Sequence, residues 1–394
     1  MNRPLHIAYI DHTGEMGGAE HLLLTLFRSL PAEEIIPILI CGQAGRLVTE
    51  TGQLGIQTEI VSLPKFYSTS WVWGKRKIIN PFAVLWDGAS LLVGSWQLIQ
   101  KLRYLQIDII QTNTLFSHIY GGIAARALKI PSIWYFHDLV EPGRLAGLIA
   151  LIWRILVSIL PMRVVADSYA VLKPLSSSLK GRVIYPCAPD MKDNKSKDLI
   201  PLYQRLSIPE HSILTGTLGR ITYVKGLDTL IEAARLVISK NIDVHFVIFG
   251  GALFGEENYK MKLEKKVEDS GLTNNWHWMG YDELAKEYLQ EMDFVVFPSR
   301  REAFGLTLVE AGYSGKAAIG SKVGGIPEII ENGKTGILVG VEDHRELADA
   351  ILELVNNPEY AVALGVQARL RVEKLFNEKR YLNEFLGLYS DLDN

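Results

Sequence analysis

Cysteine is scarce in this sequence. Only Cys41 and Cys187 occur among 394 residues, and they form neither a CxxC pair nor a metal-binding spacing. A disulfide-stabilised scaffold and a cysteine-based metal site are therefore excluded. We expect both cysteines to act as small apolar residues in a reducing compartment.

A strong excess of charge of either sign is also lacking. The chain contains 41 Lys and Arg against 44 Asp and Glu, a net charge of −3, so nothing suggests nucleic acid as a partner. Residues 1–190 contain 17 Lys and Arg against 13 Asp and Glu, whereas the remainder is acidic. This mild asymmetry is consistent with an N-terminal half that faces something anionic, such as a membrane surface.

No apolar run reaches the ~20 uninterrupted residues that a membrane-spanning helix needs. The N-terminus, MNRPLHIAYIDH, leads directly into a strand-like run and lacks the apolar segment of a signal peptide. We therefore expect the protein in the cytoplasm.

Two unusually apolar segments allow contact with a membrane surface. For residues 145–160, which only Arg154 and Ser158 interrupt, we favour a buried helix, with an interfacial helix as the alternative. Residues 71–99 combine tryptophans with a Lys75-Arg76-Lys77 cluster. Tryptophans beside cations suit the headgroup layer, so for this segment peripheral contact with an anionic membrane and a buried helix stand as equal alternatives.

Strand-like and helix-like patterns alternate along the chain, which predicts parallel sheets with helices on both faces. The predicted strands are 5–10, 35–40, 56–61, 107–111, 133–136, 164–166 and 183–185 in the first half, and 213–218, 244–249, 276–279, 294–297, 317–319 and 336–339 in the second.

The length of the chain exceeds that of one ordinary core, so two domains are expected. Residues 186–211 break the alternation with prolines and charges. We expect a first doubly wound domain over 1–190, a linker over 191–211, a second doubly wound domain over 212–376, and a last helix over 377–394 that could cross back to the first domain.

Polar residues and glycines follow several predicted strands of the first half. Gly14, Gly17 and Gly18 separate the first strand from a predicted helix over 19–30. This loop does not match the GxGxxG motif, so two interpretations remain open. It could be a tight turn, or it could be a loop whose amides face a ligand.

His12, Asn113 and His137 fall at or just past the carboxyl ends of strands, where ligands of parallel sheets bind. His137 could donate to a sugar hydroxyl or merely satisfy its own backbone. Asp138 beside it is a candidate base or a residue that orients His137.

The functional hypothesis centres on residues 298–328, PSRREAFGLTLVEAGYSGKAAIGSKVGGIPE. Glu302 and Glu310 form an E-x7-E pattern, and a helix is expected to begin at Phe304-Gly305-Leu306. The free amides and dipole of a helix start favour an anion, so phosphate could bind there. Glu310 lies too far along the helix to serve that phosphate and is better placed for neutral hydroxyls, such as those of a ribose.

Two cations provide a second candidate site. Arg220 and Lys225 lie where the predicted strand 213–218 gives way to a helix, and they could clamp a diphosphate. The alternative is a pair of surface cations, the commoner fate of any single Lys or Arg. Gly250 ends the next predicted strand.

These motifs have a family resemblance. The strings GGAE, GRITYVKG, PSRREAFGLTLVEA, GGIPEII and NGKTGILV, in this order, resemble the retaining glycosyltransferases of family 4, with the GT-B fold, over essentially the whole chain. The resemblance implies two Rossmann-like domains facing a central cleft. The N-terminal domain, over 1–190, would bind the acceptor, and the C-terminal domain, over 212–376, would bind a nucleotide-sugar donor. It also implies that no divalent metal or other cofactor is required.

The resemblance assigns roles to particular residues. Arg220 and Lys225 look like the pair that holds the diphosphate, Glu310 like the residue that binds the ribose hydroxyls, and His137 like the active-site histidine. Glu302, with Ala303, Phe304, Gly305 and Leu306, resembles the loop that holds the donor sugar and distal phosphate, and Gly17 and Gly18 match a loop beneath the phosphates. The sequence Gly250-Gly251-Ala252 lacks an acidic residue that the family often has there, which leaves the contacts to the base open.

The leading hypothesis is therefore a metal-independent glycosyltransferase. It would transfer a hexose, with retention of configuration, from a nucleotide-diphosphate sugar to a glycan or lipid-linked acceptor in cell-surface polysaccharide or glycolipid synthesis. One alternative is a GT-B nucleotide-sugar 2-epimerase, which forms product without an acceptor. The other is a non-catalytic nucleotide-sugar-binding subunit, which binds donor without turnover.

Overall fold

The computed structural model describes residues 3–63, 70–73, 76–79, 81–140, 146–175, 181–188, 199–252 and 255–393, with the backbone alone described for 70–73, 76–79, 81–88 and 146–150. The chain forms two compact units. The first contains Met1–Tyr185 and Glu378–Asn394, and the second contains Pro186–Asn377.

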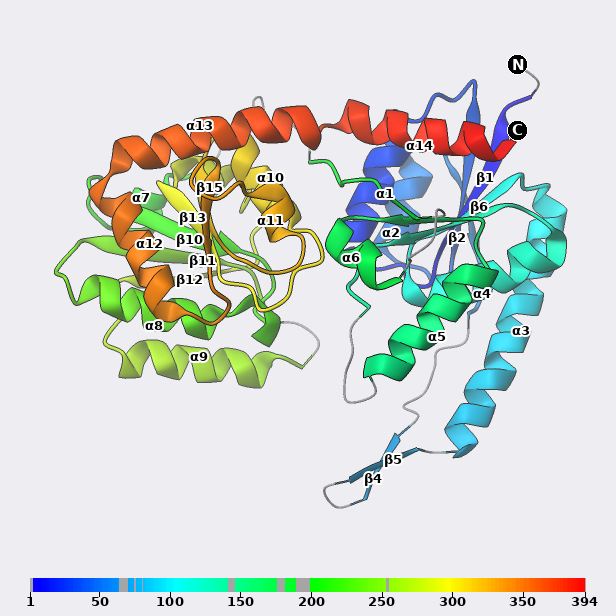
Figure 1. The fold of residues 1–394 in the computed structure, drawn as a ribbon, viewed down its shortest axis with the longest axis horizontal. Helices are drawn as coiled ribbons and strands as arrows, with labels where there is room; N and C mark the ends of the chain where they lie inside the picture. Colours follow the sequence, from blue (N-terminus) through cyan, green and yellow to red (C-terminus); the bar gives the residue numbers. More distant parts are fainter. Residues whose placement is uncertain are drawn as a thin grey trace. The chain divides into compact units, whose positions relative to one another are not determined.

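The first unit is built on a seven-stranded sheet of order β3-β2-β1-β6-β7-β8-β9, in which all neighbours are parallel (Figure 1). The order runs outward from β1 in both directions, which is the doubly wound Rossmann arrangement that the sequence predicts. The strands are β1 Leu5–Asp11, β2 Ile35–Cys41, β3 Gln57–Ile60, β6 Ile109–Thr112, β7 Ser132–Phe136, β8 Arg163–Ala166 and β9 Gly181–Val183. The last strand thus ends at Val183, where the sequence analysis expected it to begin.

Helices cover both faces of this sheet because its strands are apolar on both faces. The helices of the first unit are α1 Gly18–Ser29, α2 Arg46–Gln53, α3 Pro81–Leu105, α4 Leu115–Leu128, α5 Ala146–Ile159, α6 Tyr169–Leu175 and α14 Glu378–Asp393. Ala8 of β1 joins a buried cluster with Leu98 of α3 on one face. Tyr9 points to the opposite face, where its ring lies 4.9 Å from that of Phe27 of α1.

The last helix, α14, packs on the first sheet although it is the far end of the chain. The Tyr389 hydroxyl donates to Gln111 Oε1 at 2.7 Å and accepts from the Tyr9 hydroxyl at 3.0 Å. The Phe385 ring lies 5.3 Å from the ring of Tyr135. All of these side chains are buried, so α14 is an integral part of the first unit.

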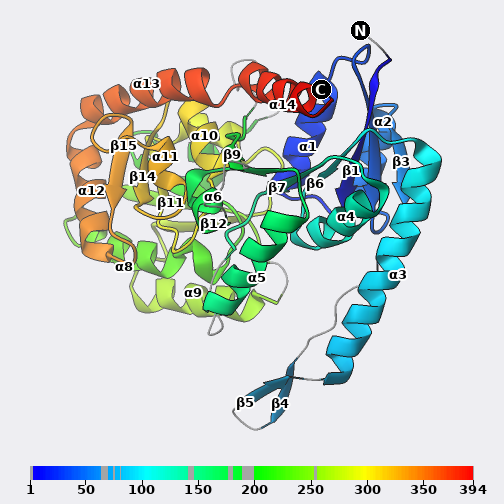
Figure 2. The same ribbon diagram turned by 45° about the vertical axis from the view of Figure 1, so that its right-hand side comes forward.

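Between β3 and α3 the chain forms a feature that the sequence analysis did not anticipate. Strands β4 Ser70–Trp73 and β5 Arg76–Ile79 pair as an antiparallel hairpin, separate from the main sheet. Figures 1 and 2 show the hairpin at the start of the long helix α3. Lys75 and the side chains of Arg76 and Lys77 lie outside the described residues, so the membrane prediction for this cluster stays a prediction.

Helix α5 corrects the expectation of a buried helix over 145–160. Its inner face packs through Trp153, 5.7 Å from the ring of Phe136, and through Val157. The opposite face, however, exposes about half of the side chains of Leu151, Ile155 and their apolar neighbours. The composition indicated burial all around, whereas in this unit the sheet covers only one side of the helix.

The second unit contains a six-stranded parallel sheet of order β12-β11-β10-β13-β14-β15, again the doubly wound arrangement. The strands are β10 Ile213–Leu218, β11 Val244–Phe249, β12 Trp276–Gly280, β13 Phe294–Phe297, β14 Ala317–Ser321 and β15 Gly336–Val339. The α-helices are α7 Leu202–Leu206, α8 Leu227–Ile238, α9 Glu257–Asp269, α10 Leu306–Tyr313, α11 Ile326–Ile329, α12 His344–Asn356 and α13 Pro358–Leu375, and the short 3-10 helices are η2 Tyr223–Lys225 and η3 Glu287–Glu291.

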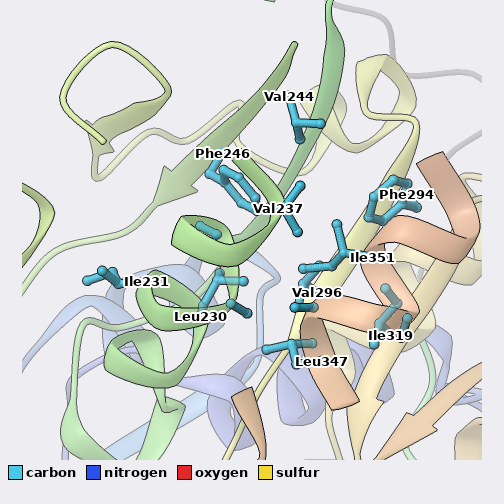
Figure 3. Close-up of a cluster of buried hydrophobic side chains, with 14 of the residues drawn as sticks. Leu230, Ile231, Val237, Val244, Phe246, Phe294, Val296, Ile319, Leu347 and Ile351 are labelled. Carbon is cyan, nitrogen blue, oxygen red and sulfur yellow. The ribbon is translucent and has the colours of Figure 1, made fainter. Parts of the chain in front are cut away.

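The core of the second unit lies between α8, α12 and the sheet (Figure 3). Leu230 and Val237 of α8 meet Phe246 of β11, Val296 of β13 and Ile351 of α12, and all are at most 1% exposed. Burying one such side chain contributes about 1.5–3 kcal/mol. This packing fixes β10 and β13 in the middle of the sheet, where the candidate site begins.

Part of the expected linker is packed. Within 191–211, α7 buries Leu202 completely, and the Leu202 amide donates to Glu291 at 2.6 Å. Residues 202–206 of the expected linker thus form a short packed helix. A helix of five residues is too short to display an apolar period, so the pattern gave no signal for it.

Candidate functional site

In the second unit, the chain reverses its winding direction between β10 and β13. Ligands of doubly wound sheets bind at this switch point, outside the carboxyl ends of the strands. A small pocket at this edge is lined, among other residues, by Gly219, Arg220, Lys225, Pro298 and Ser299. The structure thus brings the two cations predicted from the sequence to the edge at which a ligand is expected.

Lys225 ends the 3-10 helix η2, and backbone contacts fix this turn against the loop after β13. Gly226, at φ +67°, makes the approach possible because a Cβ there would lie 2.0 Å from the Pro298 carbonyl oxygen. The Lys225 Nζ lies 2.6 Å from Glu302 Oε2. Two residues singled out from separate motifs are therefore in direct contact.

Arg300 is a structural residue of this site that the sequence analysis missed. Its guanidinium makes two bonds of 2.7 Å to the carboxylate of Asp228 and donates to the Tyr223 carbonyl at 2.8 Å. It also lies over the Tyr223 ring, 4.1 Å from the centroid. Burial alone would raise the pKa of Asp228, but the bonds from Arg300 and Tyr259 lower it. Arg300 thus ties the turn that carries Lys225 to the start of α8.

Helix α10 begins at Leu306, after Gly305 at φ +111°, which confirms the predicted helix start. The loop of Gly324 and Gly325 contacts the backbone of the segment that precedes α10. Gly325 donates to the Glu302 carbonyl at 3.1 Å, and a Cβ on Gly324 would lie 1.7 Å from that oxygen. The segment Ala303 to Leu306 is therefore held in place, and the first amides of α10 lack acceptors within the helix.

Glu310 lies inside α10 and is buried. Its carboxylate pairs with Lys286 Nζ at 2.5 Å. Burial raises the pKa of Glu310, and the Lys286 ammonium opposes that rise. Glu302 and Glu310 thus have different partners, Lys225 for one and Lys286 for the other. Lys286, which precedes η3, was not identified from the sequence because nothing in its neighbourhood resembles a motif.

Gly250 supports the cation loop through its backbone. At φ +135°, a Cβ would lie 1.8 Å from the Gly219 carbonyl oxygen, so only glycine fits without a shift. Its amide donates to the Gly280 carbonyl at 2.7 Å. These contacts position Gly219 and Arg220. They do not test the predicted contact between Gly250 and a donor.

In the first unit, the side chain of His137 is 9% exposed and pairs with Asp167, since His137 Nδ1 and Asp167 Oδ2 lie 3.0 Å apart. Burial alone would lower the pKa of His137, but Asp167 first, then Asp138 and Glu20, raise it above its ordinary value. These carboxylates therefore stabilise the protonated imidazole, in which both nitrogens donate, relative to a histidine without them. Asp167 was not among the residues predicted from the sequence.

Two further carboxyl groups lie near His137. Asp11, at the end of β1, is fully buried, and burial raises its pKa to about 8, with Glu20 adding to the rise and His137 opposing it. Burial likewise raises the pKa of Glu20 in the first turn of α1. Gly17 precedes α1 and Gly18 begins it, and a Cβ on Gly17 would lie 2.8 Å from Glu20 Oε2. The predicted Gly17–Gly18 loop thus adjoins the surroundings of His137.

The other residues noted at strand ends have local partners. His12 Nδ1 lies 2.8 Å from the Thr114 hydroxyl, and Asn113 Oδ1 accepts from Gln111 at 3.1 Å. Gly14 packs against the backbone of residues 43–45, which supports the tight-turn interpretation at that position. A narrow pocket includes Ala19, Asn113 and His137 in its lining.

The described residues contain no group of three or more His, Cys, Asp or Glu that could hold a metal ion. Cys41 and Cys187 are both free and buried. No helix within the described ranges is long and apolar enough to cross a membrane.

The two halves match two protein families. Residues 16–186 match the family described as Glycosyltransferase Family 4, and residues 202–371 match Glycosyl transferases group 1. These two ranges follow each other along the chain and correspond closely to the two units.

Curated relatives are similar over part of their length. The chain is 32% identical over 178 residues to a poly(ribitol-phosphate) alpha-N-acetylglucosaminyltransferase of Staphylococcus aureus, covering 45% of this chain and 35% of that protein. It is 30% identical over 179 residues to the lipopolysaccharide core biosynthesis mannosyltransferase LpcC of Rhizobium leguminosarum, covering 45% and 51%. The chain thus spans about a third to a half of the length of the curated relatives it matches.

Solved structures share the fold over the whole chain. Anabaena Alr3699/HepE in complex with UDP and glucose has a TM-score of 0.83 at 22% identity, covering 98% of this chain and 100% of that one. A glycosyltransferase from Rickettsia africae has a TM-score of 0.80 at 20% identity, covering 99% and 98%. At these identities the likeness establishes the architecture.

Proposed function

We propose that this chain, which has the GT-B fold and belongs to the family 4-like glycosyltransferases, transfers a hexose from a nucleotide-diphosphate sugar to a glycan or lipid-linked acceptor with retention of configuration. The observation that carries the proposal is the contact between Lys225 and Glu302 at the switch point of the second sheet. Arg220 and the start of α10 adjoin the same edge.

The proposed chemistry needs stabilisation of a leaving diphosphate. As the bond between the sugar C1 and the phosphate oxygen breaks, negative charge grows on the phosphate. Arg220, Lys225 and the free amides of α10 would stabilise that charge, and such preorganised stabilisation is usually the largest catalytic effect. Lys225 would then be shared between the phosphate and Glu302.

The two glutamates would hold hydroxyl groups. We assign the ribose to Glu310 and the donor sugar to Glu302, with Ala303 to Leu306 beside it. For retention we propose a front-face path, in which the acceptor oxygen bonds to C1 while the departing phosphate oxygen takes the acceptor proton. Each glutamate already pairs with a lysine, at 2.6 Å for Glu302 and 2.5 Å for Glu310, which suits hydroxyl binding better than a nucleophile and acid pair.

His137 is proposed to hydrogen-bond a hydroxyl of the donor sugar. Its Nδ1 faces Asp167 at 3.0 Å, so Nε2 is the nitrogen available for this contact. The raised pKa of His137 supports Nε2 as a donor.

Release of the nucleoside diphosphate with a panel of donors and acceptors tests the proposal. The panel should begin with UDP-glucose, because HepE was solved with UDP-glucose, and with UDP-N-acetylglucosamine and GDP-mannose, because relatives are named for N-acetylglucosaminyl and mannosyl transfer. We expect acceptor-dependent release with one donor, a product that keeps the anomeric configuration, and activity in EDTA.

The same assay distinguishes the alternatives. A sugar product formed without any acceptor would identify a 2-epimerase instead. Donor binding by calorimetry without turnover would identify a binding subunit. If Glu310→Ala and Lys225→Ala both retained full turnover, the site assignment would be wrong.

We also propose a role in cell-surface polysaccharide or glycolipid synthesis, carried out in the cytoplasm. The names of the relatives, which concern ribitol-phosphate polymers and lipopolysaccharide core, support the pathway. The two buried free thiols are consistent with a reducing compartment.

A further inference from the structure

Helix α5 exposes an apolar face that its own unit does not cover. Leu151, Ile152, Ile155 and Ile159 are 52%, 46%, 48% and 51% exposed, and Met162 just beyond the helix is 46% exposed. At this spacing the four helix residues lie on the side opposite Trp153 and Val157, which pack inward. A surface helix of a water-soluble domain ordinarily places polar residues there, so the stripe indicates a contact surface.

The segment that contains α5 is rich in cations. Residues 142–189 contain six Lys and Arg but a single acid, Asp167. Asp167 is 5% exposed and pairs with His137. Among the described cations of this stretch, Arg154, Lys173 and Arg182 are exposed. The surface is therefore apolar and cationic, which is the combination that binds anionic lipid.

A second stripe lies on α3. Leu92, Val93 and Trp96 are 69%, 51% and 61% exposed. Both helices lie beside α4, since α3 packs along it and the Trp153 ring of α5 lies 6.3 Å from His118 of α4. Figures 1 and 2 show α3 and α5 on the same side of the first sheet. An exposed tryptophan on α3 is typical of a side chain that sits at the headgroup level.

The position of α5 relates this surface to the chemistry. His137 lies directly after β7, and α5 is the helix that follows, so its first turn lies at the carboxyl edge of the sheet. A bilayer against α5 would thus reach the edge that carries His137.

We propose that the surface formed by α5 and the exposed stripe of α3, which we term the α5 surface, docks on an anionic lipid bilayer. Within the proposed function, on which this step rests, the docking favours a lipid-linked acceptor over a soluble glycan. The apolar side chains enter the headgroup region, while Arg154, Lys173 and Arg182 meet lipid phosphates.

Vesicle flotation tests the α5 surface without any sugar donor. The full chain should co-float with vesicles of phosphatidylcholine mixed with phosphatidylglycerol, and much less with phosphatidylcholine alone or in high salt. The triple variant Ile152→Ser/Ile155→Ser/Ile159→Ser should lower the partition coefficient at least about tenfold, because three apolar side chains no longer enter the lipid.

A matched control comes from the other unit. Val362, Val366 and Leu370 on α13 are 65%, 51% and 56% exposed, and the arginines beside them, Arg369 and Arg371, pair with Glu373 and Glu331. Val362→Ser/Val366→Ser/Leu370→Ser should leave flotation unchanged. Thermal melting of both triple variants should match the parent, because the substituted side chains are about half exposed.

The outcomes are decisive in both directions. Equal flotation of the parent and the α5 variant, or no flotation of the parent, would overturn the proposal. So would sedimentation showing that the α5 face joins two copies of the chain while vesicles are not bound. Turnover on a soluble glycan without flotation would refute membrane docking by the α5 surface and support the transferase function. Flotation without any turnover would support membrane docking and refute the transferase function.

Discussion

His137 Nδ1 and Asp167 Oδ2 lie 3.0 Å apart, and their side chains are only 9% and 6% exposed. The contact follows from strand register. Phe136 of β7 pairs with Ala166 of β8, so the residue after each strand meets the residue after the other at the carboxyl edge. The ion pair is thus set by two neighbouring parallel strands, which hold it more firmly than a loop would.

We predict that Asp167→Asn shifts the pH dependence of activity. The pKa of His137 is raised in the folded protein, chiefly by Asp167 against the effect of burial. Removing that charge should lower the pKa of His137, so the alkaline limb of kcat/KM should move to lower pH. Measuring kcat/KM across the pH range, and following the His137 ring protons by NMR, checks the shift.

The contribution of the His137–Asp167 pair to protein stability depends on pH. Because the folded pKa of His137 is raised, the pair stabilises the protein fully below the unfolded value of about 6.5 and loses this contribution as the pH rises through the folded value. Asp167→Asn should therefore destabilise the protein more at acidic than at alkaline pH. Asp138→Asn is the control, with a smaller shift because its interaction with His137 is weaker. Identical profiles for the parent and Asp167→Asn would show that Asp167 does not act through His137.

The sequence predicted one member of this pair, His137, but not its partner Asp167. His137 was predicted because it follows an apolar strand, and strand ends carry ligands. Asp167 follows a strand too, but it lies 30 residues away, and only the order β7-β8 makes them neighbours. Alternating patterns predicted the strands and the doubly wound fold, since apolar runs reveal burial directly. Side-chain partners across the sheet depend on register, which those patterns do not specify.

The same limit explains Arg300 and α5. Arg300 lies inside the motif that the sequence analysis emphasised, yet its partner Asp228 is 72 residues away. For α5, composition predicted burial, but the number of faces that neighbours cover is a property of the assembled unit. Residues whose role is local, such as Gly305 at the start of α10, were predicted well because the chain around them sets their conformation.

We predict that Lys225→Ala impairs both donor binding and transfer. The substitution removes a charge from the proposed phosphate site and leaves Glu302 without the partner now at 2.6 Å. We expect kcat/KM for the donor to fall by about 10²–10³-fold, as when one preorganised group is removed from a charge-stabilising site. Steady-state kinetics with the donor found in the panel measures the loss.

Lys266→Ala provides the comparison for Lys225→Ala. Lys266 pairs with Glu232 at 2.9 Å and lies in the last turn of α9, at the end of the helix that is farther from the carboxyl edge of the sheet. Its removal should leave kcat/KM unchanged. Equal kinetics of the two variants would contradict the role of Lys225.

We predict that Arg300→Lys destabilises the second unit. Arg300 makes a two-bond contact with Asp228 and a third bond to the Tyr223 carbonyl, which a lysine cannot reproduce. The expected loss is about 1.5–3 kcal/mol, the range for hydrogen bonds to charged groups. Urea unfolding measures it. Arg235→Lys, on an exposed pair with Glu232 at 3.4 Å, should change stability by less than about 0.5 kcal/mol, and a similar small change for Arg300→Lys would refute the structural role.

We predict that Gly226 is needed for the close approach of its turn to Pro298, and a comparison with a second glycine separates this effect from that of the left-handed backbone conformation. Gly226 and Gly271 have nearly the same φ, +67° and +69°. A Cβ on Gly226 would lie 2.0 Å from the Pro298 carbonyl oxygen, whereas a Cβ on Gly271 would meet no atom within 4 Å. Both alanine variants should incur the cost of a left-handed residue, about 1 kcal/mol. Only Gly226→Ala must also displace the Pro298 loop.

We therefore expect Gly226→Ala to lose stability beyond Gly271→Ala and to bind donor more weakly, because Lys225 and the loop of Glu302 would move apart. Urea midpoints and donor calorimetry on the two variants measure both effects. Equal stability would show that the approach to Pro298 is not needed for the fold. Lower stability with unchanged donor affinity would show that the Gly226 turn supports the unit without positioning Lys225, and the contact between Lys225 and Glu302 would then have to form independently of that turn.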